Sequence, residues 1–364
     1  MLIRQLGCLS TMELEAEVLK FISEYSSMVE EAVEKHVPRR LTHSYLVTHF
    51  GEARFKHSPE SLTEGLSKPF WELFSRGGKR WRPALTILIY EALGERAEDV
   101  AFAAAVPEII HNATLIVDDV EDSSQLRRGK PCIHHIYGVD VAVNAGNALY
   151  YLPVYLLMQS VGGKTRQLLL EKYVEMMVKL SLGQTMDIVW HRGLVSEVSE
   201  EDYLQMASYK TGALSRFAVE TACIYSGRED LLDVLGLFGE NIGTAFQIQD
   251  DYLNIFGEEA KYRKEIGGDI TEGKYTLMTV YAMRHLPREK SMRLCEILAS
   301  HTSDPVLVNE AIQLIRDSGA GDYAKKVSRN MVEEAWRAAD KTLPESPAKN
   351  RLKKLADFLV ERTL

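Results

Sequence analysis

Residues 101–122 read AFAAAVPEIIHNATLIVDDVED, and this stretch decides the expected fold. Up to Val117 it is apolar on nearly every side, as a helix buried at the centre of a protein must be. The acidic run DDVED then occupies positions 118–122. On a helix, Asp118 and Asp122 lie one turn apart on the same face, where like charges repel each other. A divalent cation relieves that repulsion, and Mg²⁺ uses one or two carboxylates together with water and phosphate oxygens.

A second acidic pair, Asp250-Asp251, lies in another apolar helical run, between Phe246 and Ile255. Asn254 follows Asp250 at the same four-residue spacing. One such cluster alone is as consistent with a solvated helix end as with a binding site. Two clusters, 132 positions apart and each inside an apolar helix, favour a site, because burying several aspartates without a cation is very costly.

The rest of the chain also has helical periodicity, with Gly and Pro at the ends of the predicted helices. Alternating strand-like runs are nearly absent, and no Pro/Ser/Gly-rich linker divides the sequence. We therefore expect one large all-α domain, a bundle of ten or more helices. A first helix is predicted from Met12 to the stop at Pro38, and the other predicted helices span 84–93, 101–117, 144–159, 164–183, 202–227, 231–256, 277–284, 289–300, 305–318, 323–342 and 346–363.

Composition limits the possible functions. The 364 residues are 46% hydrophobic, which is typical of a folded chain and excludes a disordered one. A formal net charge of −9 disfavours nucleic acid as a partner. The four cysteines form no C-x-x-C pair, so we expect a reducing, cytoplasmic location. The N-terminus lacks a secretory signal, and we expect no transmembrane segment because long uncharged apolar runs are missing.

Basic residues stand where phosphate groups would need donors. Two glycines at 77–78 precede Lys79 and Arg82, which share a helix face, and His111 lies two helical turns before Asp118. Arg forks bind phosphate through two hydrogen bonds, whereas Lys acts as a point charge. The P-loop, Rossmann, zinc-protease and serine-hydrolase motifs are all absent. The remaining candidates are Arg127, Arg128, Lys210, Lys264 and Lys274.

Together these residues resemble the trans-isoprenyl diphosphate synthases, the polyprenyl synthetase family, and in motif detail the geranylgeranyl diphosphate synthases. The resemblance covers about residues 70–362 in order. It rests on the elements GGKRWRP (77–83), EIIHN (108–112), RRG (127–129), KTG (210–212) and FQIQDD (246–251), followed by GDI…GK between Gly268 and Lys274. It implies residues 1–69 as an N-terminal helical extension and residues 70–364 as the catalytic domain, with the two clusters facing each other across a deep central cavity.

The resemblance also implies a role for each site residue, with Mg²⁺ as cofactor. Asp118, Asp122 and Asp250 would be the main metal ligands, and Asp119 and Asp251 would be secondary. The allylic prenyl diphosphate would contact Arg127, Lys210, Thr211, Gln247 and Lys264. Isopentenyl diphosphate would be held by Lys79, Arg82, His111 and Arg128, with Lys274 also in the substrate site. Homodimerisation is likewise implied by the family.

Some features depart from the family pattern or leave alternatives open. Asn254 stands where many relatives have Asp, so its part in metal binding stays open. Ala113 and Thr114, the small residues before Asp118, indicate a product longer than farnesyl diphosphate, with geranylgeranyl diphosphate as the first expectation. Tyr150 or Tyr151 is a candidate floor of the product pocket, although core packing is the favoured explanation for both. The alternatives are a longer-chain polyprenyl or farnesyl diphosphate synthase, a class I terpene cyclase, and a silent regulatory subunit.

Overall fold

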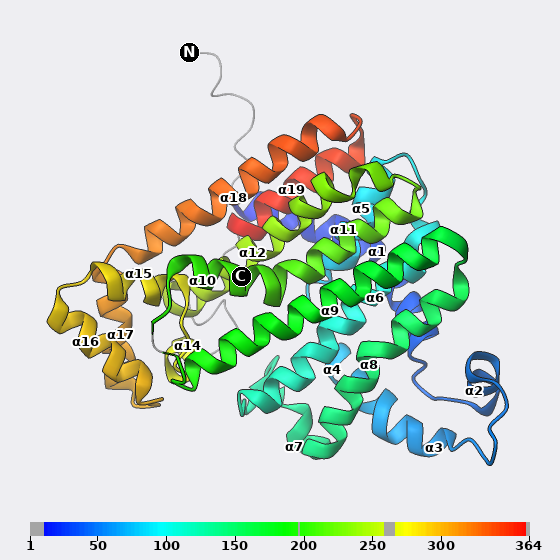
Figure 1. Ribbon diagram of the computed structural model, residues 1–364, viewed down its shortest axis with the longest axis horizontal. Coiled ribbons are helices and arrows are strands. Elements are labelled where there is room, and N and C mark those ends of the chain that lie inside the picture. Colours follow the sequence, from blue (N-terminus) through cyan, green and yellow to red (C-terminus); the bar gives the residue numbers. More distant parts are fainter. Residues whose placement is uncertain (1–10, 196, 258–265, 362–364) are drawn as a thin grey trace. The chain divides into compact units, whose positions relative to one another are not determined.

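The computed structural model describes residues 11–195, 197–257 and 266–361. These residues are almost entirely helical (Figure 1), which confirms the all-α expectation. The chain divides into two compact units: unit 2 comprises Ile22–Val174 and Glu220–Glu229, and unit 1 comprises the rest. The predicted domain boundary between residues 69 and 70 stays a prediction. The helices α1 (Thr11–His36), α9 (Gly163–His191) and α11 (Ala213–Tyr225) contribute residues to both units.

Unit 2 is built around α6, the helix that contains the quoted apolar stretch. Its residues from Ala103 to Ile110 are all buried, and it packs against α5 and α8. Gly146 of α8 permits a close approach, because an added Cβ would lie 2.4 Å from a methyl group of Val117. The elements of this unit are α2 (His43–Phe50), α3 (Pro59–Leu62), η1 (Thr63–Ser67), α4 (Lys68–Phe74), α5 (Trp81–Ala92), α6 (Ala97–Glu121), β1 (Leu126–Arg127), β2 (Lys130–Pro131), α7 (Ile133–Tyr137) and α8 (Val139–Ser160).

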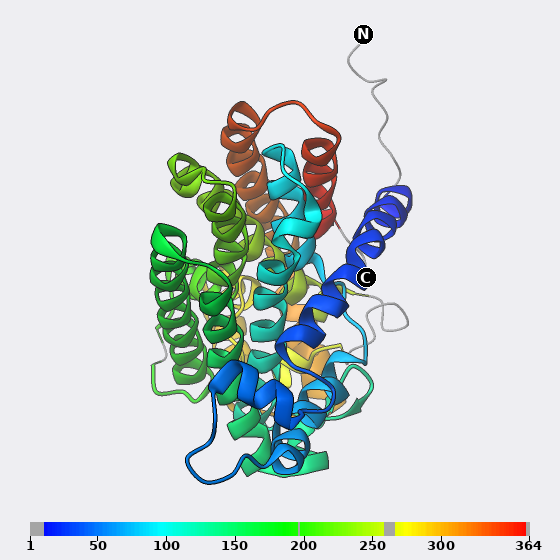
Figure 2. The same cartoon turned by 90° about the vertical axis from the view of Figure 1, so that its right-hand side faces the viewer.

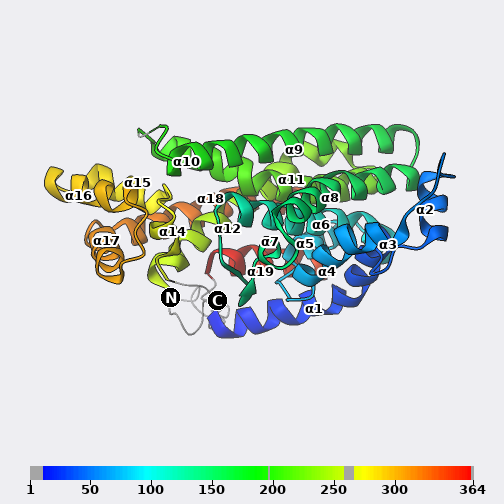
Figure 3. The ribbon, with the colours of Figure 1, turned by 90° about the horizontal axis from the view of Figure 1, so that it is seen from below.

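Unit 1 has its core between α12 and the helices that follow it. In Figure 2, α18 and α19, orange and red, lie side by side, and both pack on α12. Figure 3 shows α15, α16 and α17 grouped together, with α14 against them. The elements are α10 (Glu200–Ala207), η2 (Ser208–Gly212), α12 (Leu232–Phe256), α14 (Gly268–Thr271), α15 (Leu277–His285), α16 (Arg288–Ala299), α17 (Pro305–Asp317), α18 (Ala320–Thr342) and α19 (Pro347–Glu361), with the short η3 (Glu229–Leu231) at the boundary.

Local sequence explains where several helices begin. Ser199 accepts a hydrogen bond from Asp202 N at 3.1 Å, and its own N donates to the Asp202 carboxylate at 2.9 Å, which forms a capping box before α10. At α15 and α17 the cap is a single side-chain bond: Thr276 accepts from Thr279 N at 3.2 Å, and Asp304 accepts from Val306 N at 2.9 Å. The predicted single helix over 202–227 is wrong in one respect, because a π-helical turn, η2, separates α10 from α11.

Within the residues that the structure describes, two helices are long and apolar enough to cross a membrane by length and hydropathy alone. They are α6, whose apolar stretch is 72% buried inside the protein, and α8, whose apolar stretch is 44% buried. The sequence predicts no such segment. The extensive burial of α6 is typical of a core helix, which can be equally long and apolar.

Candidate active site

The first aspartate cluster lies at the C-terminal end of α6 in unit 2. The Asp122 N donates to Asp118 O at 2.8 Å, which is the helical bond that places the two residues one turn apart. Asp122 is the C-cap residue, and Asp118 keeps part of its side chain exposed. Tyr150 of α8 is affected by this cluster, because burial and then the charges of Glu121 and Asp118 raise its pKa. Tyr151 is instead 67% exposed in this chain.

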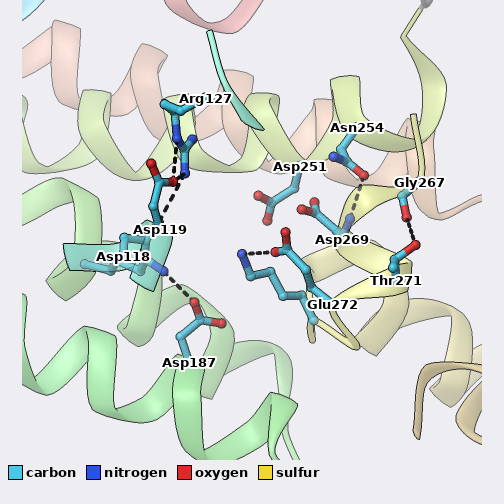
Figure 4. A network of polar contacts seen from close by, with 12 residues as sticks. Asp118, Asp119, Arg127, Asp187, Asp251, Asn254, Gly267, Asp269, Thr271 and Glu272 are labelled. Atoms are coloured by element: carbon cyan, nitrogen blue, oxygen red, sulfur yellow. Dashed lines mark hydrogen bonds and ion pairs between the residues drawn. The ribbon is translucent and has the colours of Figure 1, made fainter. Parts of the chain in front are cut away.

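Asp119, the next residue of α6, is fully buried. Its Oδ1 accepts from Arg127 Nε at 2.7 Å and lies 2.5 Å from another guanidinium nitrogen (Figure 4). The same guanidinium lies 3.7 Å from Asp118 Oδ2. Although burial alone lowers the pKa of Arg127, the neighbouring Asp119 charge raises it overall, so the guanidinium stays charged. Asp119 therefore holds Arg127 beside Asp118.

The predicted basic residues of unit 2 surround a buried acid. Burial raises the pKa of Glu108, while the charges of Arg82 and Arg128 oppose that shift. Burial, followed by the charges of Arg82 and Arg128, lowers the pKa of His111 well below its usual value, so its imidazole is neutral at pH 7. Arg128 Nη1 donates to Leu73 O at 3.2 Å, and a Cβ added to Gly78 would lie 3.1 Å from Arg128 Nη2. Lys79 lies in the same loop, just before α5.

The second cluster lies near the C-terminal end of α12 in unit 1, and a chain of hydrogen bonds runs through it. Thr211 donates to Gln247 at 2.7 Å, Gln247 donates to Asp251 Oδ1 at 2.8 Å, and Tyr203 donates to Asp251 Oδ2 at 2.6 Å. Burial raises the pKa of Asp251 to about 6. The hydrogen bonds from Tyr203 and Gln247 oppose that shift, and the charges of Asp250 and Asp187 reinforce it.

Lys210 is placed by the π-helical turn η2 and by a glycine on α9. Its Nζ lies 2.5 Å from Asp187 Oδ2. A Cβ added to Gly183 would lie 2.4 Å from the Lys210 backbone nitrogen, so only glycine permits this approach of α9 to η2. Single π-helical turns often occur at functional sites.

Asn254 has a hydrogen-bonding role that its place in the motif does not reveal. Its Oδ1 accepts from Asp269 N at 3.1 Å (Figure 4), and its main-chain O accepts from Gly267 N at 2.8 Å. Asn254 thus fixes the turn before α14, which carries Asp269. Lys274 follows this turn; its side chain forms an ion pair with Glu272, and its N donates to Asp269 O at 2.8 Å. The predicted substrate contact Lys264 lies outside the described residues.

The acidic donors around Asp251 fit a divalent cation. Asp250 and Asp187 both push the pKa of the buried Asp251 upward, so the three carboxyl groups lie close enough to repel one another when charged. Mg²⁺ prefers carboxylate oxygens and keeps several positions for water and phosphate. Within the ranges that the structure describes, no three His, Cys, Asp or Glu side chains converge as a ready-made metal cage.

Several residues around the clusters were not assigned as site residues from the sequence. Glu108 lies within the quoted element at 108–112, three residues before His111, and that spacing could have drawn attention to it. Asp187 lies 23 residues before Lys210 and outside the quoted elements. Tyr203 carries no such signal, because it lies 48 residues from Asp251 and meets it only in the folded chain.

An all-α fold with an aspartate pair near the end of each of two buried helices is the architecture of the trans-prenyltransferases. The family model described as "Polyprenyl synthetase" matches residues 63–315, and this chain belongs to that family.

Named relatives support this assignment. The chain is 36% identical over 313 residues to a short chain isoprenyl diphosphate synthase of Methanothermobacter thermautotrophicus, covering 85% of this chain and 95% of that protein. It is 33% identical to a geranylgeranyl pyrophosphate synthase of Geoglobus acetivorans, covering 83% and 92%. Among solved structures, the geranylgeranyl pyrophosphate synthetase of Pyrococcus horikoshii gives a TM-score of 0.83 at 29% identity, covering 96% of this chain and 99% of that one.

Proposed function

We propose that this enzyme joins isopentenyl diphosphate head-to-tail to an allylic prenyl diphosphate, with geranylgeranyl diphosphate as its main product. The observation that carries the proposal is the cluster of the Asp250, Asp251 and Asp187 carboxyl groups, with Lys210 Nζ 2.5 Å from Asp187 Oδ2. This combination suits a metal-bound diphosphate, which needs both carboxylates and a cationic side chain. The relatives named above as short-chain and geranylgeranyl synthases support the substrate class and the product.

Asp118, Asp122 and Asp250 are the proposed ligands of Mg²⁺, and Asp119 and Asp251 orient their neighbours. When bound, Mg²⁺ supplies positive charge that favours departure of the diphosphate. The side chains of Lys210 and Arg127 hold the allylic diphosphate, whose C–O bond breaks with the electron pair leaving on oxygen. The proposed Lys264 contact belongs to the same group.

The second substrate is held by Lys79, Arg82, His111 and Arg128, with Lys274 also in the substrate site. Its double bond forms the new carbon–carbon bond to the allylic cation, and the released diphosphate takes the proton that is then lost. Thr211 and Gln247 turn their dipoles toward the cation, since Thr211 is fixed by its hydrogen bond to Gln247. No side chain is assigned as a general base.

The test is product analysis. Purified protein is given labelled isopentenyl diphosphate and a series of allylic primers, with Mg²⁺ or with EDTA, and the dephosphorylated products are separated by chromatography. We expect geranylgeraniol with Mg²⁺ and no product with EDTA. A longer or shorter chain would correct the product alone, whereas a cyclic hydrocarbon formed without incorporation of label would identify a terpene cyclase instead.

Two variants on α12 separate the metal site from general damage to the helix. Asp250→Asn removes a proposed ligand and should lower kcat by about a hundredfold or more. Asp233→Asn alters an exposed aspartate in the first turn of the same helix and should leave activity close to wild type. Equal activity of the two variants would contradict the role of Asp250.

We also propose a homodimer, for which α9 supplies the support. Leu170, Val174, Val178 and Leu182 are exposed and recur every four residues, so they form an apolar stripe along one side of that helix. Val178→Glu should shift the protein to monomer in analytical ultracentrifugation, while Val306→Glu, at an exposed position on α17, should not. A monomeric wild-type protein would refute the proposal.

The proposed location is the cytoplasm. In the described part of the chain, Cys132, Cys223 and Cys295 are free cysteines, which suits a reducing compartment. Cell fractionation followed by immunoblotting tests this, and recovery in a membrane or secreted fraction would contradict it.

A further inference from the structure

The hairpin of β1 and β2 in unit 2 carries both arginines proposed to bind diphosphate. Its register pairs Leu126 with Pro131 and Arg127 with Lys130, so residues 128 and 129 form the two-residue turn. Both turn residues have positive φ, 54° for Arg128 and 74° for Gly129, as a type I′ turn requires. Glycine adopts this conformation freely, but for Arg128 it is strained.

An isolated hairpin with two-residue strands is too short to hold such a turn by itself. The inter-strand bonds are few, and the left-handed conformation of Arg128 is itself unfavourable. Some group outside the hairpin must therefore keep it in place.

Arg76, which follows α4, stabilises the hairpin through hydrogen bonds to its main chain. Its Nη1 donates to Arg127 O at 3.0 Å and to Pro131 O at 2.9 Å, and lies 3.5 Å from Lys130 O. One guanidinium nitrogen thus binds carbonyls from both strands. The Arg76 side chain is only 1% exposed, so it is covered by protein on all sides.

The rest of the Arg76 guanidinium is anchored to Glu72, one helical turn earlier. Arg76 Nη2 donates to Glu72 Oε1 at 3.2 Å and Nε donates to the same oxygen at 3.4 Å. The main chain beside Arg76 also participates, since Leu73 O accepts from both Arg76 N at 3.1 Å and Arg128 Nη1 at 3.2 Å. Arg76 therefore ties the Arg127–Arg128 hairpin to the end of α4, directly before the loop that carries Lys79.

We propose that Arg76 is a positioning residue that sets the diphosphate-binding geometry of the hairpin without touching substrate itself. The inference rests on the proposed function for the roles of Arg127 and Arg128. It requires the forked, planar donor set of arginine, because a lysine offers one nitrogen and cannot span both strands and Glu72 together.

The experiment compares wild type with Arg76→Met, Arg76→Lys and the matched control Arg96→Met, which alters an exposed arginine of the same unit. The first measurement is calorimetric binding of inorganic diphosphate with Mg²⁺, which needs no turnover. The second is the split between KM for isopentenyl diphosphate and kcat.

We expect both Arg76 variants to weaken diphosphate binding and raise KM by about tenfold, with kcat changed by less than about threefold. Arg96→Met should match wild type. Wild-type behaviour of Arg76→Lys would show that only the charge matters and would overturn the proposal. Unchanged diphosphate affinity in Arg76→Met, with lowered thermal stability alone, would also overturn it, because that is the result of a purely structural role.

A milder variant keeps the test decisive if Arg76→Met does not fold. Glu72→Gln weakens the second anchor of Arg76 and also the 3.8 Å ion pair of Glu72 with Lys130 on β2. Glu72 is one-third exposed, and the variant should weaken diphosphate binding about two- to threefold. An unchanged affinity would count against the proposal. A wild-type protein that binds diphosphate but makes no prenyl product would refute the proposed function and leave the role of Arg76 measurable.

Discussion

Gly183 of α9 and Lys210 of η2 approach so closely that a Cβ on Gly183 would lie 2.4 Å from the Lys210 backbone nitrogen. Helix propensity alone favours alanine over glycine by about 1 kcal/mol. Packing predicts that alanine is unfavourable here, because the atom that its Cβ would meet belongs to the main chain of Lys210 and cannot rotate away. We expect Gly183→Ala to destabilise the protein by about 2 kcal/mol and to raise KM for the allylic substrate.

Gly65→Ala is the matched control for Gly183→Ala. Gly65 is also helical, in η1, and an added Cβ would meet nothing within 4 Å. Urea unfolding should show this variant unchanged or stabilised by up to about 1 kcal/mol. If both substitutions stabilise the protein equally, the close approach of α9 to η2 is wrong.

The buried pair Asp119–Arg127 should contribute strongly to stability. Removing either partner leaves a buried charge uncompensated, so Asp119→Ala and Arg127→Ala should each cost about 3 kcal/mol in unfolding free energy. The double variant should cost about 1–3 kcal/mol less than the sum of the two. A double-mutant cycle by urea unfolding measures this, and strictly additive effects would contradict the ion pair.

His36 predicts an acid sensitivity of stability that is separate from catalysis. Its Nε2 donates to Phe102 O at 2.9 Å, its ring stacks on Phe102, and burial lowers its pKa from 6.5 to about 4. Between these values the unfolded chain binds a proton that the folded chain does not, so stability falls as pH falls through this window. We expect a loss of about 2 kcal/mol between pH 7.5 and pH 5 from this residue.

Urea titrations of His36→Gln across the same pH range test that expectation. Glutamine can still donate to Phe102 O but cannot titrate, so the variant should lose about 2 kcal/mol less than wild type on acidification. His135→Gln, at an exposed position, is the control and should follow the wild-type profile. Parallel profiles for wild type and His36→Gln would rule out the buried neutral imidazole.

Ala113 tests the proposed product length. It is fully buried on α6, and Gly146 of α8 approaches it, since an added Cβ would lie 3.3 Å from Ala113 O. An aromatic side chain there should block elongation, so Ala113→Phe should shift the main product from geranylgeranyl to farnesyl diphosphate. Chromatography of the dephosphorylated products reports the shift, with Ala113→Ser as the size-conserving control. An unchanged chain length in folded Ala113→Phe protein would remove Ala113 from the pocket wall.

The sequence by itself determined the all-α class, most helix positions and the family. The helical spacing of apolar residues indicates which face of a segment is buried. The predicted end of the first helix, at Pro38, agrees with the end of α1 at His36. The sequence pattern did not predict the short hairpin at 126–131, because two-residue strands are too short to show an alternation of apolar and polar residues. It also did not predict the break at η2, because the helical spacing of apolar residues over 202–227 continues through the π-helical turn.

Tertiary structure decided which side chains meet. Tyr203 donates a hydrogen bond to Asp251, and Arg127 donates one to Asp119. Arg76 donates to the main chain of the 126–131 hairpin, more than 50 residues away in sequence. The helical spacing of apolar residues predicts none of these contacts. Each contact forms only after separate segments pack together and exclude water. The physical reason is that burial raises the free-energy cost of an unpaired polar group, so the folded chain selects partners that the sequence alone leaves undetermined.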